Sequence, residues 1–192
     1  KKLILTASGG PFRGFSKEQL AEVTPAQALK HPTWNMGKVV TTNSATMVNK
    51  GLEIIEAHYL FDIPYEKIEA VIHPQSVIHS MVEFVDGSTI AQASPPNMKG
   101  PIAYALSGGA RVNGAMNPID WSKSSTWNFA PIDEARFPAV RVAREVGIKG
   151  GGFTAIFNAA NEVAVDAFLK GSIKFSDIVK CIEAVLSKFS NQ

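Results

Sequence analysis

Strand-like patterns recur through the first half of the chain. Residues 3–7 (LILTA) form a short apolar run with the composition of a buried strand, and residues 69–72 have the same character. From residue 76 to 94, apolar and polar positions alternate around an Asp86-Gly87 pair, which is the pattern of a β-hairpin and its turn. We therefore expect a sheet that includes a hairpin.

A helical period replaces this alternation in the stretch that begins SATMVNKGLE. Apolar residues recur there every three or four positions and predict one buried face, made of Val48, Leu52, Ile55 and Tyr59. We expect a helix over residues 45–61 that starts at Ser44, a residue type favoured as an N-cap. Two capping boxes, at 16–19 and 24–27, predict short helices further upstream.

Beyond residue 95 the pattern changes twice. Up to about residue 135 the chain is rich in Pro, Gly, Asn and Ser, which is typical of a linker wrapped against a domain. Helical periods then return in three segments, 138–146, 157–169 and 177–189. Ser176 is placed to cap the last of them. This order predicts a small helical bundle at the C-terminal end.

Together these patterns predict an α/β chain in three parts. We expect an α+β domain with a mixed sheet and hairpin over residues 1–107, a linker over 108–134 and a helical domain over 135–192. The chain starts inside a predicted strand and without a methionine. We therefore expect it to be a fragment whose neighbouring strands come from preceding sequence.

Composition narrows the classes of function. The 192 residues are 45% hydrophobic, enough for a buried core, and the net charge of +2 is spread without a basic run. This distribution argues against nucleic acid as a partner but permits small anionic ligands. No apolar run reaches the roughly 20 residues of a membrane span, so no membrane partner is expected. Cys181 is the single cysteine, which excludes an internal disulfide and a cysteine-rich zinc site.

Polar residues crowd the start of the predicted 45–61 helix. They bring a hydroxyl, an amide, an ammonium and a carboxylate close together, from Ser44, Asn49, Lys50 and Glu53. The free N–H groups of a helix start and the first three side chains suit a phosphate, whereas Glu53 suits a hard metal ion or a sugar hydroxyl. The alternative is a solvated helix face with an intrahelical contact between Lys50 and Glu53. The sequence leaves both interpretations open.

Two further stretches also allow two interpretations each. The glycine-rich turn SGGPFRG (8–14) can point backbone N–H groups at an anion or simply lead out of the strand. The stretch HPTWNMG places Trp34 and Met36 where a surface loop is expected, so these side chains either plug the core or close over a ligand as a lid. His73 and His79 are expected on one strand face if Pro74 does not break the register, with structural hydrogen bonds.

The chain resembles the 1-deoxy-D-xylulose 5-phosphate reductoisomerase family in five motifs: SGGPFR, HPTWNMG, NSATMVNKGLE, VIHPQSVIHSMVEF and NAANEVAV. The resemblance covers nearly the whole chain. It implies a metal-assisted rearrangement of the ketose phosphate, followed by hydride transfer from NADPH that gives 2-C-methyl-D-erythritol 4-phosphate for isoprenoid precursor synthesis by the non-mevalonate pathway. Residues 1–107 would then be the catalytic domain, with a lid over 9–37.

The resemblance also implies roles for single residues. It implies a phosphate clamp that binds the substrate, formed by Ser8, Ser44, Asn49 and Lys50. His31 would bind the substrate and Trp34 would cover its carbon chain, both as catalytic residues of a lid that is mobile without ligand. Gly37 and Met36 would contact NADPH. Glu53 would be catalytic, binding the substrate and ligating Mg²⁺ or Mn²⁺.

Parts of the family pattern are absent. The family's Asp-Ser-Glu motif, which supplies two more metal ligands, and its nucleotide-binding domain do not occur in these residues, so we expect the chain alone to be inactive. Asn43 and Asn97 stand where many members have Asp, and SGGARV (107–112) lacks the usual Trp-Pro.

The resemblance further implies a homodimer that forms through the sheet, and a location in the bacterial cytoplasm or in a plastid-type organelle. The competing interpretation is a non-catalytic module that binds phosphate or mediates dimerisation. Such a module would bind phosphate ligands without any dependence on a metal.

Overall fold

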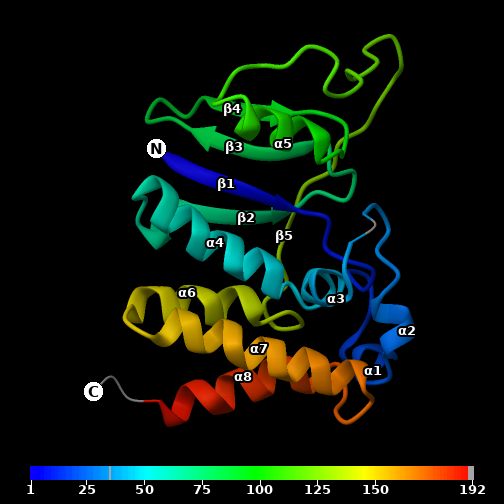
Figure 1. Cartoon of the computed structure of the whole chain (residues 1–192), viewed down its shortest axis with the longest axis vertical. Helices are drawn as coiled ribbons and strands as arrows, with labels where there is room; N and C mark the ends of the chain where they lie inside the picture. The colour runs from blue at the N-terminus through cyan, green and yellow to red at the C-terminus, as the bar shows by residue number, and fades with distance from the viewer. Residues whose placement is uncertain (35, 190–192) are drawn as a thin grey trace.

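A central helix, α4, separates a mixed sheet from a helical bundle in the computed structural model, which describes residues 1–34 and 36–189 (Figure 1). The strands are β1 (Lys2–Ala7), β2 (Ile68–Ile72), β3 (Ile78–Glu83), β4 (Thr89–Ala93) and β5 (Ala130–Pro131). The helices are α1 (Lys17–Ala21), α2 (Pro25–Ala28), α3 (Lys38–Thr46), α4 (Val48–Phe61), the 3₁₀ helix η1 (Tyr65–Lys67), α5 (Lys99–Leu106), α6 (Ala139–Lys149), α7 (Phe153–Leu169) and α8 (Asp177–Lys188). The predicted α/β fold class is confirmed.

The described strands form one mixed sheet in the order β4-β3-β1-β2-β5. β1 lies parallel to β2, with Leu3 opposite Ile68, and antiparallel to β3. Because parallel neighbours need a crossover, the chain between them leaves the sheet and returns, and it carries α1 to α4 on the way. The predicted strands and the predicted hairpin are confirmed.

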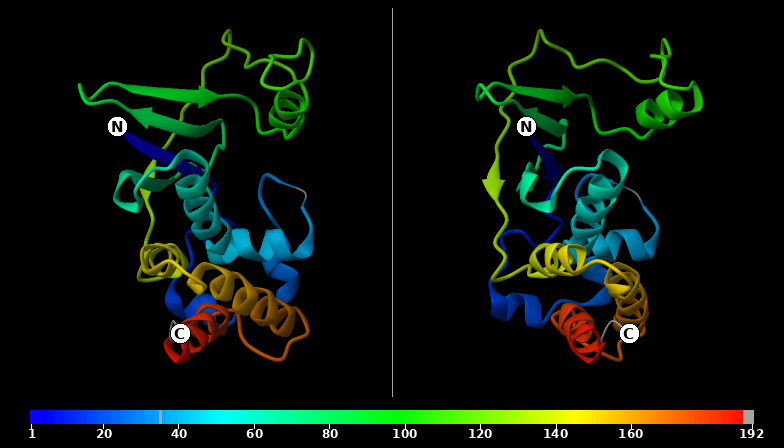
Figure 2. Two further views of the ribbon diagram at one scale, coloured as in Figure 1. Left: turned by 60° about the vertical axis from the view of Figure 1, so that its left-hand side comes forward. Right: turned by 90° about the vertical axis from the view of Figure 1, so that its left-hand side faces the viewer.

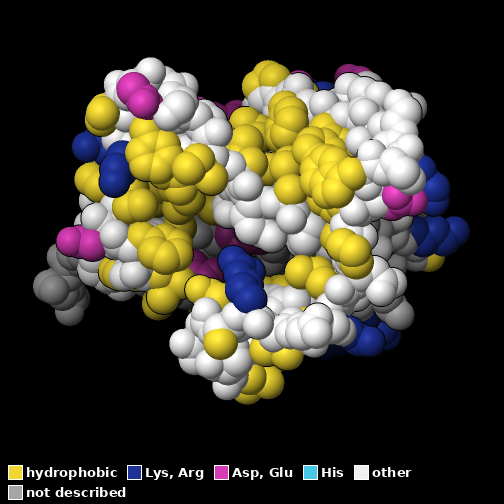
Figure 3. Space-filling view, turned by 90° about the horizontal axis from the view of Figure 1, so that it is seen from above, with side chains coloured by type: hydrophobic (Ala, Val, Ile, Leu, Met, Phe, Trp, Pro, Cys, Tyr) yellow, Lys and Arg dark blue, Asp and Glu magenta, His cyan; other side chains and the backbone are white. Residues whose placement is uncertain are grey.

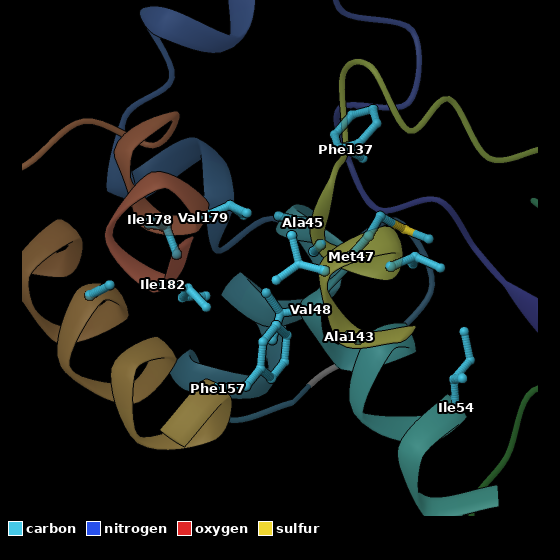
Figure 4. Close-up of a cluster of buried hydrophobic side chains, with 14 of the residues drawn as sticks. Ala45, Met47, Val48, Ile54, Phe137, Ala143, Phe157, Ile178, Val179 and Ile182 are labelled. Atoms are coloured by element: carbon cyan, nitrogen blue, oxygen red, sulfur yellow. The ribbon is translucent and has the colours of Figure 1, made fainter. Parts of the chain in front are cut away.

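Apolar side chains from α4 and the C-terminal helices form the main core. Val48 and Ile54 of α4 are fully buried, as is Phe157 of α7. Figure 4 shows labelled side chains of α3, α4, α6, α7 and α8 in this cluster. α4 and α6 approach so closely that a Cβ atom on Gly51 would lie 2.7 Å from the Cβ atom of Ala143. The C-terminal helices therefore fix the position of α4.

The single helix predicted over residues 45–61 is in fact two helices. Met47, with a φ angle of 66°, adopts the left-handed conformation, which ends α3 and starts α4. Ser44 consequently lies inside α3 and is not an N-cap. The predicted buried stripe is also wrong at Tyr59, which is 63% exposed, whereas Ile54 is buried because α4 packs between the sheet and the bundle.

Of the four predicted helix caps, two are confirmed, and Ser44 is excluded because it lies inside α3. The side chains of Ser16 and Thr24 each accept the backbone N–H group three residues ahead and complete capping boxes. The predicted Ser176 cap is wrong, because Ser176 has a helical backbone and no side-chain cap bond. The Asp177 carboxylate instead accepts the backbone N–H group of Lys174 at 3.3 Å.

The two histidines predicted on one strand face occupy different segments. His73 follows β2 and is buried, with its Nδ1–H donated to the Asn128 carbonyl at 2.9 Å and its Nε2 accepting from Val77 N at 3.1 Å. His79 lies in β3 and donates its Nε2–H to the Ser94 carbonyl at 3.0 Å. The condition for a shared face is not met, because β2 ends at Ile72 and the chain turns at Pro74 before β3 begins.

The segment predicted as a lid, residues 9–37, is partly built into the core. Phe12, Leu20 and Ala28 are buried, and the Phe12 ring packs edge-on against Phe175 at 5.2 Å between centroids. The lid is expected to be mobile without ligand, but up to residue 28 its apolar side chains have packing partners in the core. Residue 35 lies outside the described residues, and the motion of the lid stays a prediction.

The segment between the hairpin and the bundle touches the sheet at one end. α5 has no buried residue and stands, with the hairpin, away from the bundle (Figure 2). β5 lies within the predicted linker 108–134 and pairs with β2, with Ala130 opposite Ile72. The domain boundaries remain a prediction. None of the helices in the described ranges combines the length and hydropathy needed to cross a bilayer.

The close approach of α4 and α6 yields a testable expectation for Gly51→Ala. The added methyl group would overlap the Ala143 side chain, so we expect the free energy of unfolding to fall by about 1–3 kcal/mol, although alanine is the better helix former. Gly100→Ala in α5 is the matched control, because there the methyl group meets the flexible end of Met116. Thermal and urea unfolding would measure the stability of both variants. If Gly51→Ala were as stable as Gly100→Ala, the packing argument would be contradicted.

Candidate functional site

A cleft of about 1020 Å³ lies where β1, the α3–α4 junction and the segment after β4 meet. Every predicted site residue except Gly37 lines it: Ser8, His31, Trp34, Met36, Ser44, Asn49, Lys50 and Glu53. Gly37 is instead the exposed N-cap of α3. The fold thus gathers residues from three separate sequence motifs around one space.

His31 links two hydroxyls of the predicted phosphate clamp. Its Nε2 lies 3.1 Å from Ser8 Oγ and 3.0 Å from Ser44 Oγ. Its Nδ1 accepts the backbone N–H groups of Thr33 and Trp34 at 3.0 Å and 2.9 Å. The proton of the neutral ring is therefore on Nε2, and this single N–H is shared between the two serine hydroxyls. Burial lowers the pKa of His31 below its ordinary value, so the ring is neutral at pH 7.

The glycine-rich turn brings Ser8 against α3. Gly9 and Gly10 both have positive φ angles, 81° and 64°, and the Gly10 N–H group donates to Ser8 Oγ at 3.2 Å. A Cβ atom on Gly10 would lie 2.8 Å from the carbonyl oxygen of Ser44. Glycine at this position therefore allows the two serines to come within reach of the same histidine.

The first two turns of α4 supply an ammonium, an amide and a carboxylate. Asn49 Nδ2 donates to Glu53 Oε1 at 2.6 Å, and the Lys50 ammonium donates to the other carboxylate oxygen of Glu53. Lys50 is only 7% exposed, whereas the Glu53 side chain is 36% exposed. The intrahelical contact is the one the solvated interpretation predicts, but the lysine is not solvated. Glu53 provides the anion that a buried ammonium requires. An ammonium that is buried at the wall of a cleft, and not in solvent, favours the interpretation as a site.

Sequence reasoning missed one wall of the cleft, which the sheet provides. Ser76 lies there with a left-handed φ angle of 51° and is 6% exposed. Its hydroxyl has no hydrogen-bond partner among the described residues. Strained backbone and an unpaired buried hydroxyl in a cleft are both typical of ligand-binding positions. The polar run HPQSVIHS was the available signal, but nothing in it predicts the φ angle.

A second missed wall comes from the segment after the hairpin. Its lining residues include Asn97, Met98, Tyr104, Arg111 and Met116. The Arg111 guanidinium lies 4.5 Å from the centre of the Tyr104 ring, in a cation–π contact. With Lys50 it gives the cleft two permanent cations, against the single carboxylate of Glu53 among the described lining residues. This balance suits an anionic ligand.

The carboxylate of Glu53 is the group in the cleft that suits a hard divalent cation. Its oxygens reach the cleft, and oxygen ligands are those that Mg²⁺ and Mn²⁺ prefer. Within the described ranges, no three His, Cys, Asp or Glu side chains gather closely enough to hold a metal ion by themselves. Glu53 therefore fits the role of one ligand in a set completed by other groups.

Comparison with known proteins identifies the family. The DXP reductoisomerase C-terminal domain model matches residues 93–192, and the 1-deoxy-D-xylulose 5-phosphate reductoisomerase C-terminal domain model matches residues 1–61. The chain belongs to the 1-deoxy-D-xylulose 5-phosphate reductoisomerase family. The family resemblance predicted from the sequence motifs is confirmed.

Named relatives and solved structures agree with this assignment. The 1-deoxy-D-xylulose 5-phosphate reductoisomerases of Kitasatospora griseola and Pseudarthrobacter chlorophenolicus are 62% and 63% identical, over 98% and 97% of this chain. A crystal structure of a reductoisomerase in complex with NADPH, fosmidomycin and magnesium is 44% identical with a TM-score of 0.94, covering 98% of this chain and 46% of its own. The Zymomonas mobilis enzyme in complex with NADPH is 46% identical with a TM-score of 0.91, covering 99% and 49%. The chain spans about half the length of these reductoisomerases, 49% and 48% for the first two.

The His31 network predicts a pH dependence. Because the folded pKa lies below the unfolded value of about 6.5, the unfolded chain binds the proton first as the pH falls. This part of the stability is complete above about pH 6.5 and is lost as the pH falls toward the folded pKa. We expect the ring signals of His31 in NMR spectra to titrate with a midpoint below 6.5.

The variant His31→Asn isolates this contribution. Because this variant lacks the titrating ring, its free energy of unfolding should fall less than that of the parent as the pH is lowered from 7 toward the folded pKa of His31. Urea unfolding at several pH values would measure the difference. His79 serves as the internal comparison, because burial also lowers its pKa and its signal should persist in the variant. A His31 midpoint at or above 6.5 would contradict the described environment of the ring.

Proposed function

We propose that this chain forms the substrate-binding part of an NADPH-dependent reductoisomerase that converts 1-deoxy-D-xylulose 5-phosphate to 2-C-methyl-D-erythritol 4-phosphate. The observation that carries the proposal is the buried Lys50 ammonium, which lines the same cleft as the other clamp residues Ser8, Ser44 and Asn49. A dianion held by an ammonium, an amide and two hydroxyls matches the chemistry of a sugar phosphate. The family assignment supplies the reaction.

In the proposed complex the phosphate group replaces Glu53 as the partner of Lys50. The ammonium is held in place by its burial, so it gains a dianion without moving far. Asn49 Nδ2 and the hydroxyls of Ser8 and Ser44 donate to the remaining phosphate oxygens. His31 orients both hydroxyls through its Nε2–H. The clamp thereby positions the rest of the substrate for reaction.

The same exchange frees the Glu53 carboxylate. Glu53 would then ligate Mg²⁺ or Mn²⁺ and bind the substrate, with further ligands from groups outside this chain. A bound metal ion would polarise substrate oxygens as a Lewis acid, and NADPH would supply the hydride. Met36 and Gly37, which lie just before α3, would contact NADPH. The neighbouring structures in complex with NADPH and magnesium support both cofactors.

Residues 30–37 form the part of the predicted lid that we retain. His31 anchors this segment, because its Nδ1 holds the backbone of Trp34 while its Nε2 reaches the clamp. The Trp34 side chain lines the cleft and would cover the carbon chain of the substrate and exclude water. The His31 side chain would thus take part both in phosphate binding and in ordering of the lid.

A homodimer that forms through the sheet is also proposed. The edge strand β4 and helix α5 expose large apolar side chains, among them Ile90, Ile102 and Leu106. Seen from above, hydrophobic side chains gather on the end of the molecule formed by β4, α5 and the following segment (Figure 3). Exposed apolar patches and strand edges are typical of subunit interfaces. The proposed setting is the non-mevalonate pathway, in the bacterial cytoplasm or a plastid-type organelle.

Substitutions of Lys50 and Glu53 are expected to impair different steps in the full-length enzyme. Lys50→Ala removes a charge-assisted contact worth roughly 1.5–3 kcal/mol, so the substrate affinity should fall about ten- to a hundredfold while the metal requirement stays nearly normal. Glu53→Gln should raise the metal concentration for half activity and slow turnover sharply. Independent titrations of substrate and metal would measure both effects.

NADPH affinity is the control for this pair, since neither residue is proposed to contact the cofactor. A Glu53→Gln enzyme with an unaltered metal requirement and normal turnover would return Glu53 to the role of a solvated helix residue. If both variants bind phosphate ligands normally and no metal affects binding, the clamp assignment is wrong. Phosphate binding that depends on Lys50 but never on a metal would instead support the non-catalytic module.

The isolated 192-residue chain is expected to lack reductoisomerase activity. In the described ranges no group of side chains can hold the metal alone, and reactants that are not held together lose the large advantage of proximity. The measurement is NADPH consumption that depends on substrate, with the full-length enzyme as the positive control. Sustained turnover by the isolated chain would contradict this expectation.

A further inference from the structure

A buried amide pair connects the C-terminal bundle to the helix that carries the clamp serine. Asn161 of α7 is fully buried, and its Nδ2 donates to Asn43 Oδ1 of α3 at 3.0 Å. Asn43 is itself only 5% exposed. The next residue in α3 is Ser44, whose hydroxyl lies 3.0 Å from His31 Nε2. One hydrogen bond therefore connects α7 to Asn43, the residue that precedes the clamp residue Ser44.

Stability alone does not account for this pair. Asn161 Oδ1 has no hydrogen-bond partner among the described residues, although it is buried. An incompletely satisfied polar pair is no better for stability than two apolar side chains of similar volume. The directional bond does, however, hold two helices in one relative position, which apolar contacts do less strictly.

The surroundings of α3 make such a constraint useful. Its first turn faces solvent at Val39 and Val40, which are 45% and 42% exposed. The second half is buried and closely approached on another side by Gly10, where a Cβ atom would lie 3.0 Å from the Ala45 Cα atom. The rotation of α3 about its axis decides where the Ser44 hydroxyl points. Asn161 is placed to fix that rotation.

We propose that Asn161 is a positioning residue, which acts through Asn43 to orient Ser44 in the phosphate clamp. The C-terminal helical bundle would thereby take part in substrate binding without contacting the substrate. This inference rests on the proposed function, because it assigns a role in the same clamp.

The test uses the full-length enzyme and measures affinity and stability together. Asn161→Leu leaves the Asn43 amide buried without its donor, so we expect the dissociation constant of the sugar phosphate to rise about tenfold and the thermal midpoint to fall. The double variant Asn43→Leu/Asn161→Leu replaces the polar pair by an apolar one. It should recover the stability but not the affinity.

Two variants serve as controls. Asn158→Leu changes an amide on the same helix whose Nδ2 donates to Glu162 at 3.0 Å and has no bond to α3, so the affinity should be unchanged. Asn43→Asp keeps an oxygen acceptor for Asn161 Nδ2, so the affinity should stay within about threefold of the parent. If Asn161→Leu does not fold, the double variant and Asn43→Asp still decide the question.

The outcomes separate the two proposals. Recovery of both affinity and stability in the double variant would show that Asn161 acts only in packing and would overturn this inference. If Asn161→Leu binds the sugar phosphate normally and Lys50→Ala does not, the positioning role of Asn161 is wrong and the clamp assignment is retained. Normal affinity in both of these variants would overturn the clamp itself, and the positioning role with it.

Discussion

The close packing of α4 against α6 is the constraint on which both halves of the structure depend. Gly51 permits this approach because any side chain there would overlap Ala143. α4 also contacts β1 and β2, so it is held on one side by the sheet and on the other by the bundle. Asn49, Lys50 and Glu53 surround this glycine in sequence. The core of the protein and the proposed clamp are therefore positioned by the same two turns of helix.

The electrostatic state of the cleft follows from this geometry. Lys50 is only 7% exposed, and a buried ammonium is stable only with an anion beside it. In the described structure Glu53 is that anion. In the proposed function this pair would exchange partners, since the Glu53 side chain is far more exposed than Lys50 and could turn away from it when a phosphate binds. A buried cation with a replaceable partner would allow the first two turns of α4 to serve two ligands.

The sequence predicted most of the architecture, because strands, hairpin and C-terminal helices follow local periodicity. Local pattern could not predict the break at Met47, since a left-handed methionine is imposed by the surrounding packing and not by its own preference. The clamp residues were accessible because they lie in motifs with a family resemblance. Ser76 and Asn161 were not, since their significance depends on an unpaired hydroxyl and on a contact between distant helices. Both features depend on the tertiary structure.

The crossover between β1 and β2 has a consequence for how the protein folds. Leu3 pairs with Ile68, and every residue of the proposed phosphate clamp lies in the chain between these two partners. Such pairings form slowly, because the entropy cost of closing so long a loop comes before the stabilising contacts are made. In contrast, α7 and α8 meet through a short connection. The helical bundle should consequently form early along the folding pathway, and the clamp should take shape only when the parallel strands have joined. A kinetic intermediate would then contain native-like helices before it gained any affinity for phosphate.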